Sequence, residues 1–446
     1  MNPQRAAALD LADFFLAGEA SQEAMVRGAI RAFGREWPWM AGLCRRVRRR
    51  AGEYFHDFSR DEMAVMILDY TAFAKAWAGE GERPRVVSYC LEAPPARVPP
   101  GWLFPVALPE LRNAVELAAW LEVSPDELAW FADRWRDQGS ADSPLRHYRY
   151  RWVAKNSGGL RLIEIPKARL CAMQRRILGG ILNLVRPHEA VHGFRRGRSC
   201  VTHAARHAGK SVVLRMDLKD FFPSIGAARI HALFARLGYS DSVARLLTGV
   251  CTHRTPSDVL SPPGVRRAVG FAARQAFRSR HLPQGAPTSP ALANLCAFRL
   301  DLRLDALARS LGATYTRYAD DLAFSGAKAF AAATQRFHVQ VAAIALEEGF
   351  AVNTRKTRIM GSGGRQRITG MVVNRHPNLQ RREFDTLKAM LTNCLRHGPE
   401  TQNREGRADF RAHLQGKVAY AAMVNPARGE RLKELLGRIA WPENPI

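Results

Sequence analysis

Two adjacent carboxylates stand between two β-prone runs in the stretch YTRYADDLAFS, residues 315–325. Aromatic, β-branched and apolar residues flank Asp320 and Asp321, a pattern that predicts a strand, a tight turn and a second strand, with the acids at or beside the turn. Neighbouring anions repel each other, so such a pair belongs either to a solvated turn or to a site for a hard cation. The choice depends on whether a third carboxylate and phosphate-binding residues occur elsewhere.

A third carboxylate ends another strand-like run. The apolar stretch SVVLRMD, residues 211–217, finishes at Asp217. Alone, Asp217 is equally well explained as a turn or helix cap. Together with Asp320 and Asp321 it forms a set of carboxylates from two strands, which can hold two Mg²⁺ ions about 3.5–4 Å apart. Because Mg²⁺ keeps its other positions for water and substrate phosphates, this set suits nucleotidyl transfer.

The composition indicates a globular protein with a polyanionic partner. The 446 residues are 47% apolar, which is enough for two or three domains and a sizeable core. Lys and Arg number 67 against 41 Asp and Glu, and the resulting net charge of +26 favours nucleic acid as the partner. There is no signal segment and no apolar run of about 18 residues, so a soluble, cytoplasmic protein with no membrane partner is expected. The seven cysteines contain no CxxC pair, which predicts reduced core thiols.

The spacing of apolar residues, together with a Pro-rich stretch, divides the chain into three segments. An N-terminal segment, residues 1–108, has helical spacing after a capping Ser21 and ends in the Pro-rich stretch 93–109, which reads as a linker. Strand, turn and helix patterns alternate within residues 109–375. The last segment, residues 376–446, is helical and basic. We therefore expect an α+β fold with an N-terminal helical extension.

Five motifs stand in the order seen in reverse transcriptases, a family that the chain resembles over about residues 110–440. In chain order they are GLRLIEIPKARLCAMQRRIL (159–178), DLKDFF (217–222), LPQGAPTSP (282–290), YADD (318–321) and NTRKT (353–357). The resemblance implies a right-hand polymerase fold with fingers, a palm built on an antiparallel sheet and a helical thumb. It also implies that Asp217, Asp320 and Asp321 are the catalytic, metal-binding triad, with Mg²⁺ as cofactor and Mn²⁺ as a possible substitute.

The resemblance further implies a nucleotide site around the triad. Gln284 would lie against the incoming dNTP, and Gly285 would let the backbone approach a ligand closely. Phe222 would crowd a ribose 2′-hydroxyl and so favour dNTPs over rNTPs. Arg161 and Lys167 would flank a strand of the fingers and neutralise the triphosphate. The other members of the expected substrate site are Leu218, Lys219, Asp220, Phe221, Tyr318, Ala319 and Lys356.

Some of these residues have specific roles or plain alternatives. Lys356 is expected to protonate or stabilise the departing pyrophosphate. Lys219 and Asp220 could contact the triphosphate through their backbone amides, or could simply be solvated turn residues. Phe221 also suits a core position. The Gln-Gly pair could be no more than a loop before a helix expected over 290–306.

Two further stretches resemble the retron reverse transcriptases of bacteria. VHGFRRGRSC (191–200) and THAARH (202–207) precede the catalytic strand, and RITGMVVN (367–374) follows the hairpin. Retron enzymes carry an Asn-Ala-x-x-His element and a Val-Thr-Gly triplet at these places. Here His203 replaces the Asn and Ile368 replaces the Val, which puts any RNA contact of the lost amide in doubt. A long N-terminal extension is also found in some myxobacterial retron proteins.

Membership of the retron type implies several partners. The enzyme would bind a cognate structured noncoding RNA, prime from a guanosine 2′-hydroxyl and make branched RNA-linked single-stranded DNA (msDNA), often in antiphage defence with an effector protein. The extension would enlarge the RNA-binding surface or support the fingers. Arginine-rich runs at 45–50 and 266–280 are further candidates for phosphate contacts. The expected RNA-binding residues are His203, His207, Thr369, Gly370, Arg381, Arg382, Lys388 and Lys417.

Other functions remain open on the sequence alone. A group II intron-like or other bacterial defence reverse transcriptase would share the palm but use a different primer. A non-catalytic RNA-binding regulator would keep the fold and lose the chemistry, although the complete set of three aspartates, Gln284 and Lys356 argues against such decay. An RNA-dependent RNA polymerase is disfavoured because Phe222 should obstruct ribonucleotides.

Overall fold

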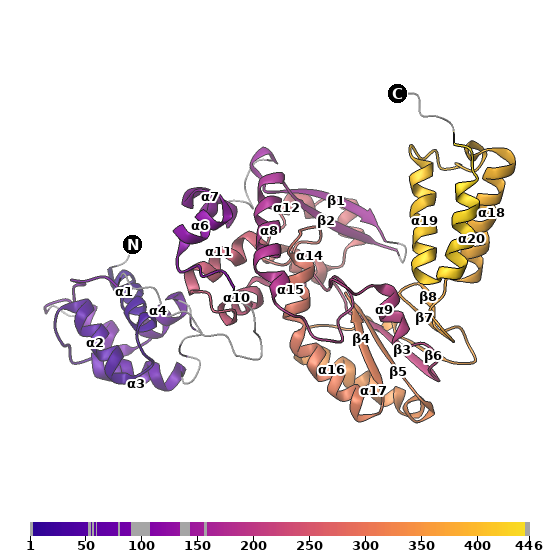
Figure 1. The fold of residues 1–446 in the computed structure, drawn as a ribbon. Helices are drawn as coiled ribbons and strands as arrows, with labels where there is room; N and C mark the ends of the chain where they lie inside the picture. Colours follow the sequence, from indigo (N-terminus) through magenta and orange to yellow (C-terminus); the bar gives the residue numbers. More distant parts are fainter. Residues whose placement is uncertain are drawn as a thin grey trace. The chain divides into compact units, whose positions relative to one another are not determined.

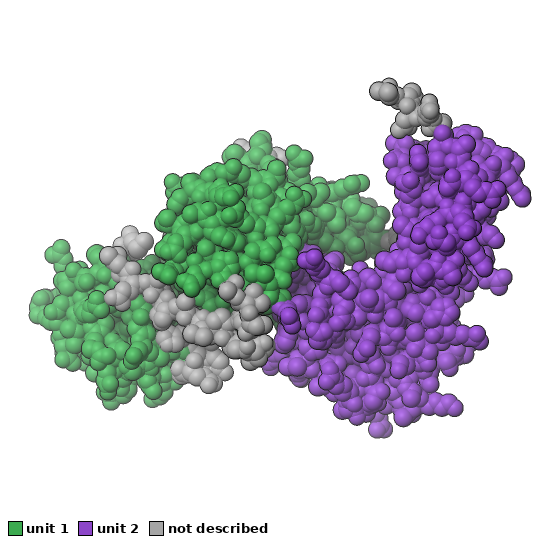
Figure 2. Space-filling model, in the orientation of Figure 1, with its two compact units in different colours: residues 1–185, 225–289 green, residues 186–224, 290–446 purple. Residues whose placement is uncertain are grey.

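The computed structural model describes residues 3–51, 55, 58, 60–78, 81–90, 108–133, 143–155 and 158–441. The chain forms two compact units, residues 1–185 with 225–289 and residues 186–224 with 290–446 (Figure 2). Each is treated below by itself. Apart from its last two positions, the Pro-rich stretch 93–109 lies outside the described residues. The boundaries expected at 108 and 375 stay predictions.

Unit 1 begins with a cluster of helices, as expected from the spacing over residues 1–80 (Figure 1). Ser21 caps the second helix, since its hydroxyl accepts a hydrogen bond from the Ala24 N–H at 3.1 Å. The apolar faces meet in one core, where Trp39 packs edge-to-face with Phe33 and Phe73. The helical extension is thus confirmed. The helices are α1 (Pro3–Ala17), α2 (Gln22–Phe33), α3 (Met40–Ala51), α4 (Arg60–Leu68) and α5 (Thr71–Ala78).

The rest of unit 1 combines a β-hairpin with helices. The hairpin pairs β1 (Tyr148–Ala154) with β2 (Leu160–Pro166) in antiparallel register, and α8 (Ala168–Gly180) follows directly. Ser124 and Glu127 form the capping box that starts α7. The other elements are α6 (Ala114–Leu121), α7 (Pro125–Phe131), η3 (Ser143–Leu145), η4 (Leu182–Leu184), α10 (Ala227–Arg236), α11 (Asp241–Cys251), α12 (Ser257–Leu260), α13 (Pro263–Ala268) and α14 (Phe271–Arg278).

Unit 2 is built on a four-stranded antiparallel sheet in the order β4-β5-β3-β6. Its strands are β3 (Val212–Asp217), β4 (Thr314–Tyr318), β5 (Asp321–Gly326) and β6 (Arg358–Gly361). The helices before and after the β4–β5 hairpin are α15 (Ser289–Cys296), α16 (Phe298–Ser310) and α17 (Lys328–Glu347). The single helix expected over 290–306 is therefore wrong: Ala297, with ψ near 4°, separates two helices.

The two faces of this sheet have different partners. Because side chains alternate along a strand, Leu214 of β3 and Phe324 of β5 share one face. There Phe324 meets Phe337 of α17 edge-to-face at 5.0 Å. Val213 and Ala323 lie on the other face, in a core shared with α9 (Cys200–Ala205) and the C-terminal helices.

The C-terminal part of unit 2 is helical. Three helices stand side by side, drawn in yellow in Figure 1, and they pack through an apolar core that includes Leu391, Leu414 and Leu432. The elements here are η5 (Thr354–Lys356), β7 (Arg367–Ile368), β8 (Met371–Val372), α18 (Arg381–His397), η6 (Pro399–Thr401), α19 (Phe410–Val424) and α20 (Pro426–Gly437). The mixture of helices and antiparallel sheets confirms the expected α+β class.

Candidate active site

The hairpin predicted around YADD is present. β4 and β5 pair with Tyr318 opposite Asp321, which leaves Ala319 and Asp320 as the two-residue turn. Short connections of this length are the commonest way to join antiparallel strands. The two adjacent acids are thus placed at the turn and directly after it.

Asp217 lies at the same edge of the sheet. β3 pairs with β5 so that Asp217 stands directly opposite Asp321. The backbone N–H of Leu218 donates to the Asp320 carbonyl at 2.8 Å, which joins the end of β3 to the turn. The fold therefore brings Asp217 together with Asp320 and Asp321, from which it is separated by more than 100 residues of sequence.

Two cations of the protein contact these carboxylates. The Lys356 ammonium donates to both Asp217 oxygens, at 2.8 and 2.9 Å. The Arg215 guanidinium donates to both Asp321 oxygens, with Nη2 at 2.7 and 2.9 Å. Sequence reasoning missed Arg215, although it stands two residues before Asp217 and strand alternation places both on one face.

Electrostatics at this edge favour an added cation. Burial, followed by the charges of Asp217 and Asp321, raises the pKa of Asp320 to about 6. Burial also raises the pKa of Asp321, and Arg215 only partly opposes this. Oxygen-only donors of this kind fit a hard divalent ion. As the side chains stand, no three His, Cys, Asp or Glu groups among the described residues are arranged to hold a metal, and the Asp217 and Asp321 carboxylates instead contact Lys356 and Arg215.

The segment after Asp217 is held by the protein's own backbone. The N–H of Lys219 donates to the Ala351 carbonyl at 2.7 Å, and that of Leu218 is bonded to Asp320. The expected contact of the Lys219 amide with a triphosphate is therefore replaced by an internal hydrogen bond. Asp220 adopts a positive φ of 46°, consistent with a turn position.

The two phenylalanines of this segment differ in environment. Phe221 is buried and its ring packs against Phe350 with centroids 5.6 Å apart, so the core explanation applies to its side chain. Phe222 is only half-buried, with the rings of Phe221 and Phe194 at 5.7 and 6.1 Å. Tyr318 is also half-buried, beside the ring of Phe194 at 6.4 Å.

Gln284 and Gly285 belong to unit 1, where they contact β2. The Gln284 carbonyl accepts from the Glu164 N–H at 2.9 Å. Gly285 has a φ of 137°, and a Cβ there would lie 2.6 Å from the Glu164 carbonyl oxygen. The glycine was expected to permit approach of a ligand, but the close approach in the structure is to the protein's own backbone.

Arg161 and Lys167 lie on and just after the same strand. Arg161 is exposed on β2, and the Lys167 ammonium donates to the Pro144 carbonyl at 2.8 Å. Between them, the buried Glu164 carboxylate contacts His281 Nε2 at 2.9 Å. Burial works to lower the pKa of His281, but the charge and hydrogen bond of Glu164 outweigh it and raise that pKa.

The structure corrects the RNA-binding role expected for two histidines. His203 and His207 are completely buried in unit 2. His207 forms hydrogen bonds with Ser325 Oγ at 2.7 Å and Thr316 Oγ1 at 2.6 Å, and His203 Nδ1 bonds the same Thr316 oxygen at 2.7 Å. His203 thus joins α9 to β4, and His207 joins the turn after α9 to β4 and β5. Neither ring has surface left for RNA.

The remaining RNA-binding candidates lie at the surface. Thr369 and Gly370 form the turn between β7 and β8, with φ of 45° and 86°. The cations Arg381, Arg382 and Lys388 on α18 and Lys417 on α19 are exposed.

The arginine run 45–50 lies on α3 and is partly engaged within unit 1. Arg46 and Arg50 both pair with Asp69, at 2.8 and 3.0 Å. Arg48 donates to the Ala20 carbonyl at 2.5 Å. Part of this basic run therefore serves the helical extension itself.

Comparison with known proteins defines the class. Residues 153–387 match the family model described as reverse transcriptase (RNA-dependent DNA polymerase). This range contains both strands of the hairpin, Asp217 and Lys356. The chain belongs to the reverse transcriptases and is an RNA-directed DNA polymerase, a class that works on a nucleic-acid template and generally uses divalent metal ions.

Individual relatives define the type. The chain is 42% identical over 326 residues to the retron Mx65 reverse transcriptase of Myxococcus xanthus, covering 73% of this chain and 71% of that protein. It is 38% identical to the retron Mx162 reverse transcriptase of the same organism, with 72% and 66% covered. The retron Ec86 reverse transcriptase of Escherichia coli is 28% identical, with 67% and 84% covered. This chain is of the retron type. Within the described residues, no helix is long and apolar enough to cross a membrane.

Proposed function

We propose that this enzyme binds a cognate structured noncoding RNA, primes DNA synthesis from a guanosine 2′-hydroxyl of that RNA, and produces branched RNA-linked single-stranded DNA. The observation that carries the catalytic part is the meeting of Asp217, Asp320 and Asp321 at one edge of the sheet. The similarity to retron reverse transcriptases supports the RNA partner and the priming chemistry. A cytoplasmic role in antiphage defence with an effector protein is part of the same proposal.

In this proposal the sheet of unit 2 is the palm, β1 and β2 belong to the fingers, and α18–α20 form the thumb. Asp217, Asp320 and Asp321 would hold two Mg²⁺ ions, or Mn²⁺ in their place. Bound there, the ions would supply Lewis-acid activation of the attacking hydroxyl and neutralisation of phosphate charge. The raised pKa of Asp320 supports this role, because burial and the charges of Asp217 and Asp321 disfavour its charged form, and a bound cation would offset both.

Protein residues would orient the substrates around this centre. Lys356, whose ammonium lies at Asp217 and whose side chain is 46% exposed, would stabilise the departing pyrophosphate. The half-buried ring of Phe222 would stand under the sugar and exclude a 2′-hydroxyl. Gln284, Gly285, Arg161 and Lys167 would form the nucleotide-binding part of the fingers.

RNA contacts would come from the C-terminal helices. The exposed cations of α18 and α19 suit a phosphate backbone, and a helical thumb that grips backbone rather than bases would permit translocation. Thr369 and Gly370 are proposed to contact RNA from their turn, in which Gly370 is exposed and Thr369 half-buried. The two buried histidines have no part in this surface.

The experiment isolates the purified protein with its bound nucleic acid, digests the RNA with RNase, and examines any DNA for a covalently attached branched RNA nucleotide. We expect a short DNA joined to a guanosine 2′-oxygen. Linear DNA without a branch would support the alternative of an intron-like or other defence enzyme with different priming. Absence of DNA from the wild type, together with tight RNA binding, would support a non-catalytic regulator.

A further inference from the structure

The turn that carries Asp320 is conformationally strained. Ala319 has a φ of 56°, in the left-handed region that residues with a side chain rarely adopt. Such a conformation persists only where the surrounding structure holds it. Because Ala319 lies between Tyr318 and Asp320, whatever holds this residue also sets the position of the catalytic carboxylates.

A buried arginine, Arg317, contacts the turn from one face of the hairpin. Arg317 is completely buried, and strand alternation places it on the face opposite Asp321. Its Nη1 donates to the Ala319 carbonyl at 3.0 Å. The guanidinium also lies over the ring of Phe221, 5.5 Å from the centroid, and so contacts the segment that follows Asp217.

An aspartate of α16 neutralises this arginine. Asp301 accepts from Arg317 Nε and Nη2, both at 2.7 Å, and neither side chain has any exposed surface. The Tyr315 hydroxyl also donates to Asp301, at 2.7 Å. Burying a charge is costly unless it is paired and hydrogen-bonded, and this guanidinium is both.

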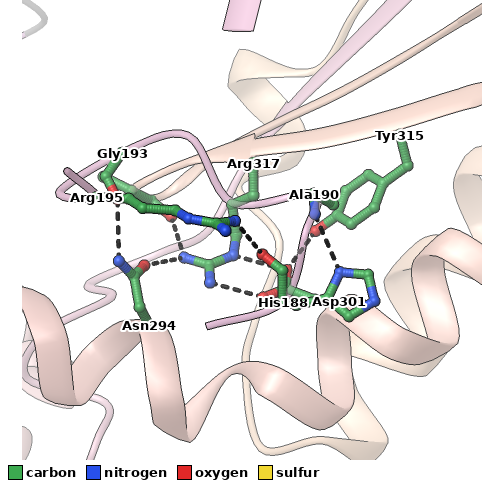
Figure 3. A network of polar contacts seen from close by, with 9 residues as sticks. His188, Ala190, Gly193, Arg195, Asn294, Asp301, Tyr315 and Arg317 are labelled. Carbon is green, nitrogen blue, oxygen red and sulfur yellow. Dashed lines mark hydrogen bonds and ion pairs between the residues drawn. The ribbon is translucent and has the colours of Figure 1, made fainter. Parts of the chain in front are cut away.

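An asparagine of α15 links the arginine to a second support of the turn. Asn294 accepts from Arg317 Nη1 at 3.0 Å, and its Nδ2 donates to the Gly193 carbonyl at 2.9 Å (Figure 3). Gly193 packs directly against the turn, since a Cβ there would lie 2.5 Å from the Ala319 nitrogen. Arg317 and Gly193 thus hold Ala319, and Asn294 joins them.

We propose that Arg317, anchored by Asp301 and Asn294, is a positioning residue that fixes the Ala319–Asp320 turn in the geometry required to bind divalent metal. The inference rests on the metal site proposed above. The guanidinium suits this role because its planar fork binds Asp301 with two donors while a third reaches the turn. Outer contacts that orient metal ligands commonly change metal affinity by about 10- to 100-fold when removed.

The test measures Mn²⁺ affinity by electron paramagnetic resonance on the purified full chain without nucleotide. Asn294→Ala removes the link between Arg317 and Gly193. Tyr315→Phe is the matched control, because it removes one buried hydrogen bond to Asp301 and leaves the turn contacts in place. We expect Mn²⁺ binding to weaken at least about tenfold in Asn294→Ala and to change by less than about twofold in Tyr315→Phe. Thermal unfolding of both variants measures their purely structural cost.

Equal Mn²⁺ affinities in wild type and a folded Asn294→Ala would overturn the proposal, as would equal weakening in both variants. If Asn294→Ala does not fold, Asn294→Asp takes its place, because it keeps an oxygen acceptor for Arg317 and loses the donor to Gly193. Weaker Mn²⁺ binding by that variant supports the proposal, and wild-type affinity overturns it.

A parallel DNA-synthesis assay separates this inference from the proposed function. In Asn294→Ala the Mg²⁺ concentration for half-maximal synthesis should rise, with synthesis largely restored at high Mg²⁺. A wild-type protein that binds Mn²⁺ but makes no DNA would refute the proposed function, while the affinity comparison would still decide the positioning role.

Discussion

At the scale of single residues, the candidate site is defined by opposed charges. Asp217 and Asp321 each contact a protein cation, whereas burial and the neighbouring carboxylates leave Asp320 with a raised pKa. A site that is short of positive charge is suited to bind metal ions, and ions bound there would in turn attract a nucleotide phosphate. The side chains that line it are few enough to be tested one at a time.

Replacement of Asp217 or Asp320 by Ala should abolish DNA synthesis while RNA binding persists. Metal-ion stabilisation is worth several kcal/mol, so the rate should fall at least about a hundredfold. Primer extension and a filter-binding assay measure the two properties. Asp126→Asn, an exposed aspartate of α7, is the control and should retain synthesis. Retained synthesis in Asp217→Ala would contradict the metal site.

Replacement of Phe222 by Ala should increase ribonucleotide incorporation relative to deoxynucleotide incorporation at least about tenfold, because a steric barrier to the 2′-hydroxyl is removed. Competition between rNTP and dNTP in primer extension measures the ratio. Phe271→Ala, which truncates an exposed ring of unit 1, should leave the ratio unchanged. An unchanged ratio in Phe222→Ala would reject the steric role.

At the scale of elements, buried polar contacts fasten the secondary structure on which the site depends. In unit 1, Glu164 joins β2 to the loop of Gln284 and Gly285 by a backbone hydrogen bond and an ion pair with His281. In unit 2, His207 joins the turn after α9 to both strands of the hairpin. Buried networks of this kind must be complete, because each unpaired group would cost free energy.

Gly285→Ala should lower the free energy of unfolding by about 1–3 kcal/mol, because its φ is strained for alanine and the new Cβ would meet the Glu164 carbonyl. Thermal or denaturant unfolding measures the change. Gly264→Ala is the matched control, since that position in the same unit has open space around it and an ordinary φ. Equal stability of the two variants would contradict the close contact.

Acid should weaken unit 2 through its buried histidines. Burial lowers the pKa of His207 to about 3 from an ordinary value of 6.5. Between these values the unfolded chain binds more protons than the folded one, so stability is lost as the pH falls from 6.5 towards 3, by up to about 1.4 kcal/mol per pH unit for each such group.

Melting temperatures measured across this pH range test the dependence. His207→Gln should reduce it, whereas His397→Gln, on the exposed surface of α18, should not. If His207→Gln melts with the wild-type dependence on pH, the buried neutral ring is not its source.

At the scale of the whole molecule, charge is distributed unevenly along the sequence. Residues 1–80 contain 11 Lys and Arg against 11 Asp and Glu, so the net charge of +26 resides entirely beyond them. A neutral extension is poorly suited to bind phosphates, and several of its arginines pair internally. Two roles were expected for this extension: to enlarge the RNA-binding surface or to support the fingers. We therefore favour the second, structural role.

RNA affinity should fall steeply with salt concentration, because phosphate contacts release counterions. Lys388→Ala on α18 should remove one phosphate contact, so the magnitude of the slope of log affinity against log salt should fall by about 1. Lys75→Ala on α5, an exposed lysine of the neutral extension, should leave that slope unchanged. Equal slopes for wild type and Lys388→Ala would remove this residue from the RNA-binding surface.

Local sequence patterns were sufficient to predict much of the secondary structure and the three carboxylates at the centre of the site. The alternation around Asp320 and Asp321 predicted the hairpin, and the apolar run before Asp217 placed this residue at a strand end. Capping at Ser21 and Ser124 was readable because a helix start depends on a few neighbouring residues. These features are local, and five ordered motifs were enough to identify the family.

Only the tertiary structure decided which side chains are buried and which contacts close between distant segments. The sequence could not reveal that His203 and His207 lie inside unit 2, or that Arg215 pairs with Asp321. Nor could it reveal that Gly285 packs closely against the backbone of Glu164. The Arg317 network is of the same kind, since α15, α16 and the hairpin meet only after folding. Burial and pairing depend on packing between elements, and packing is a property of the folded chain.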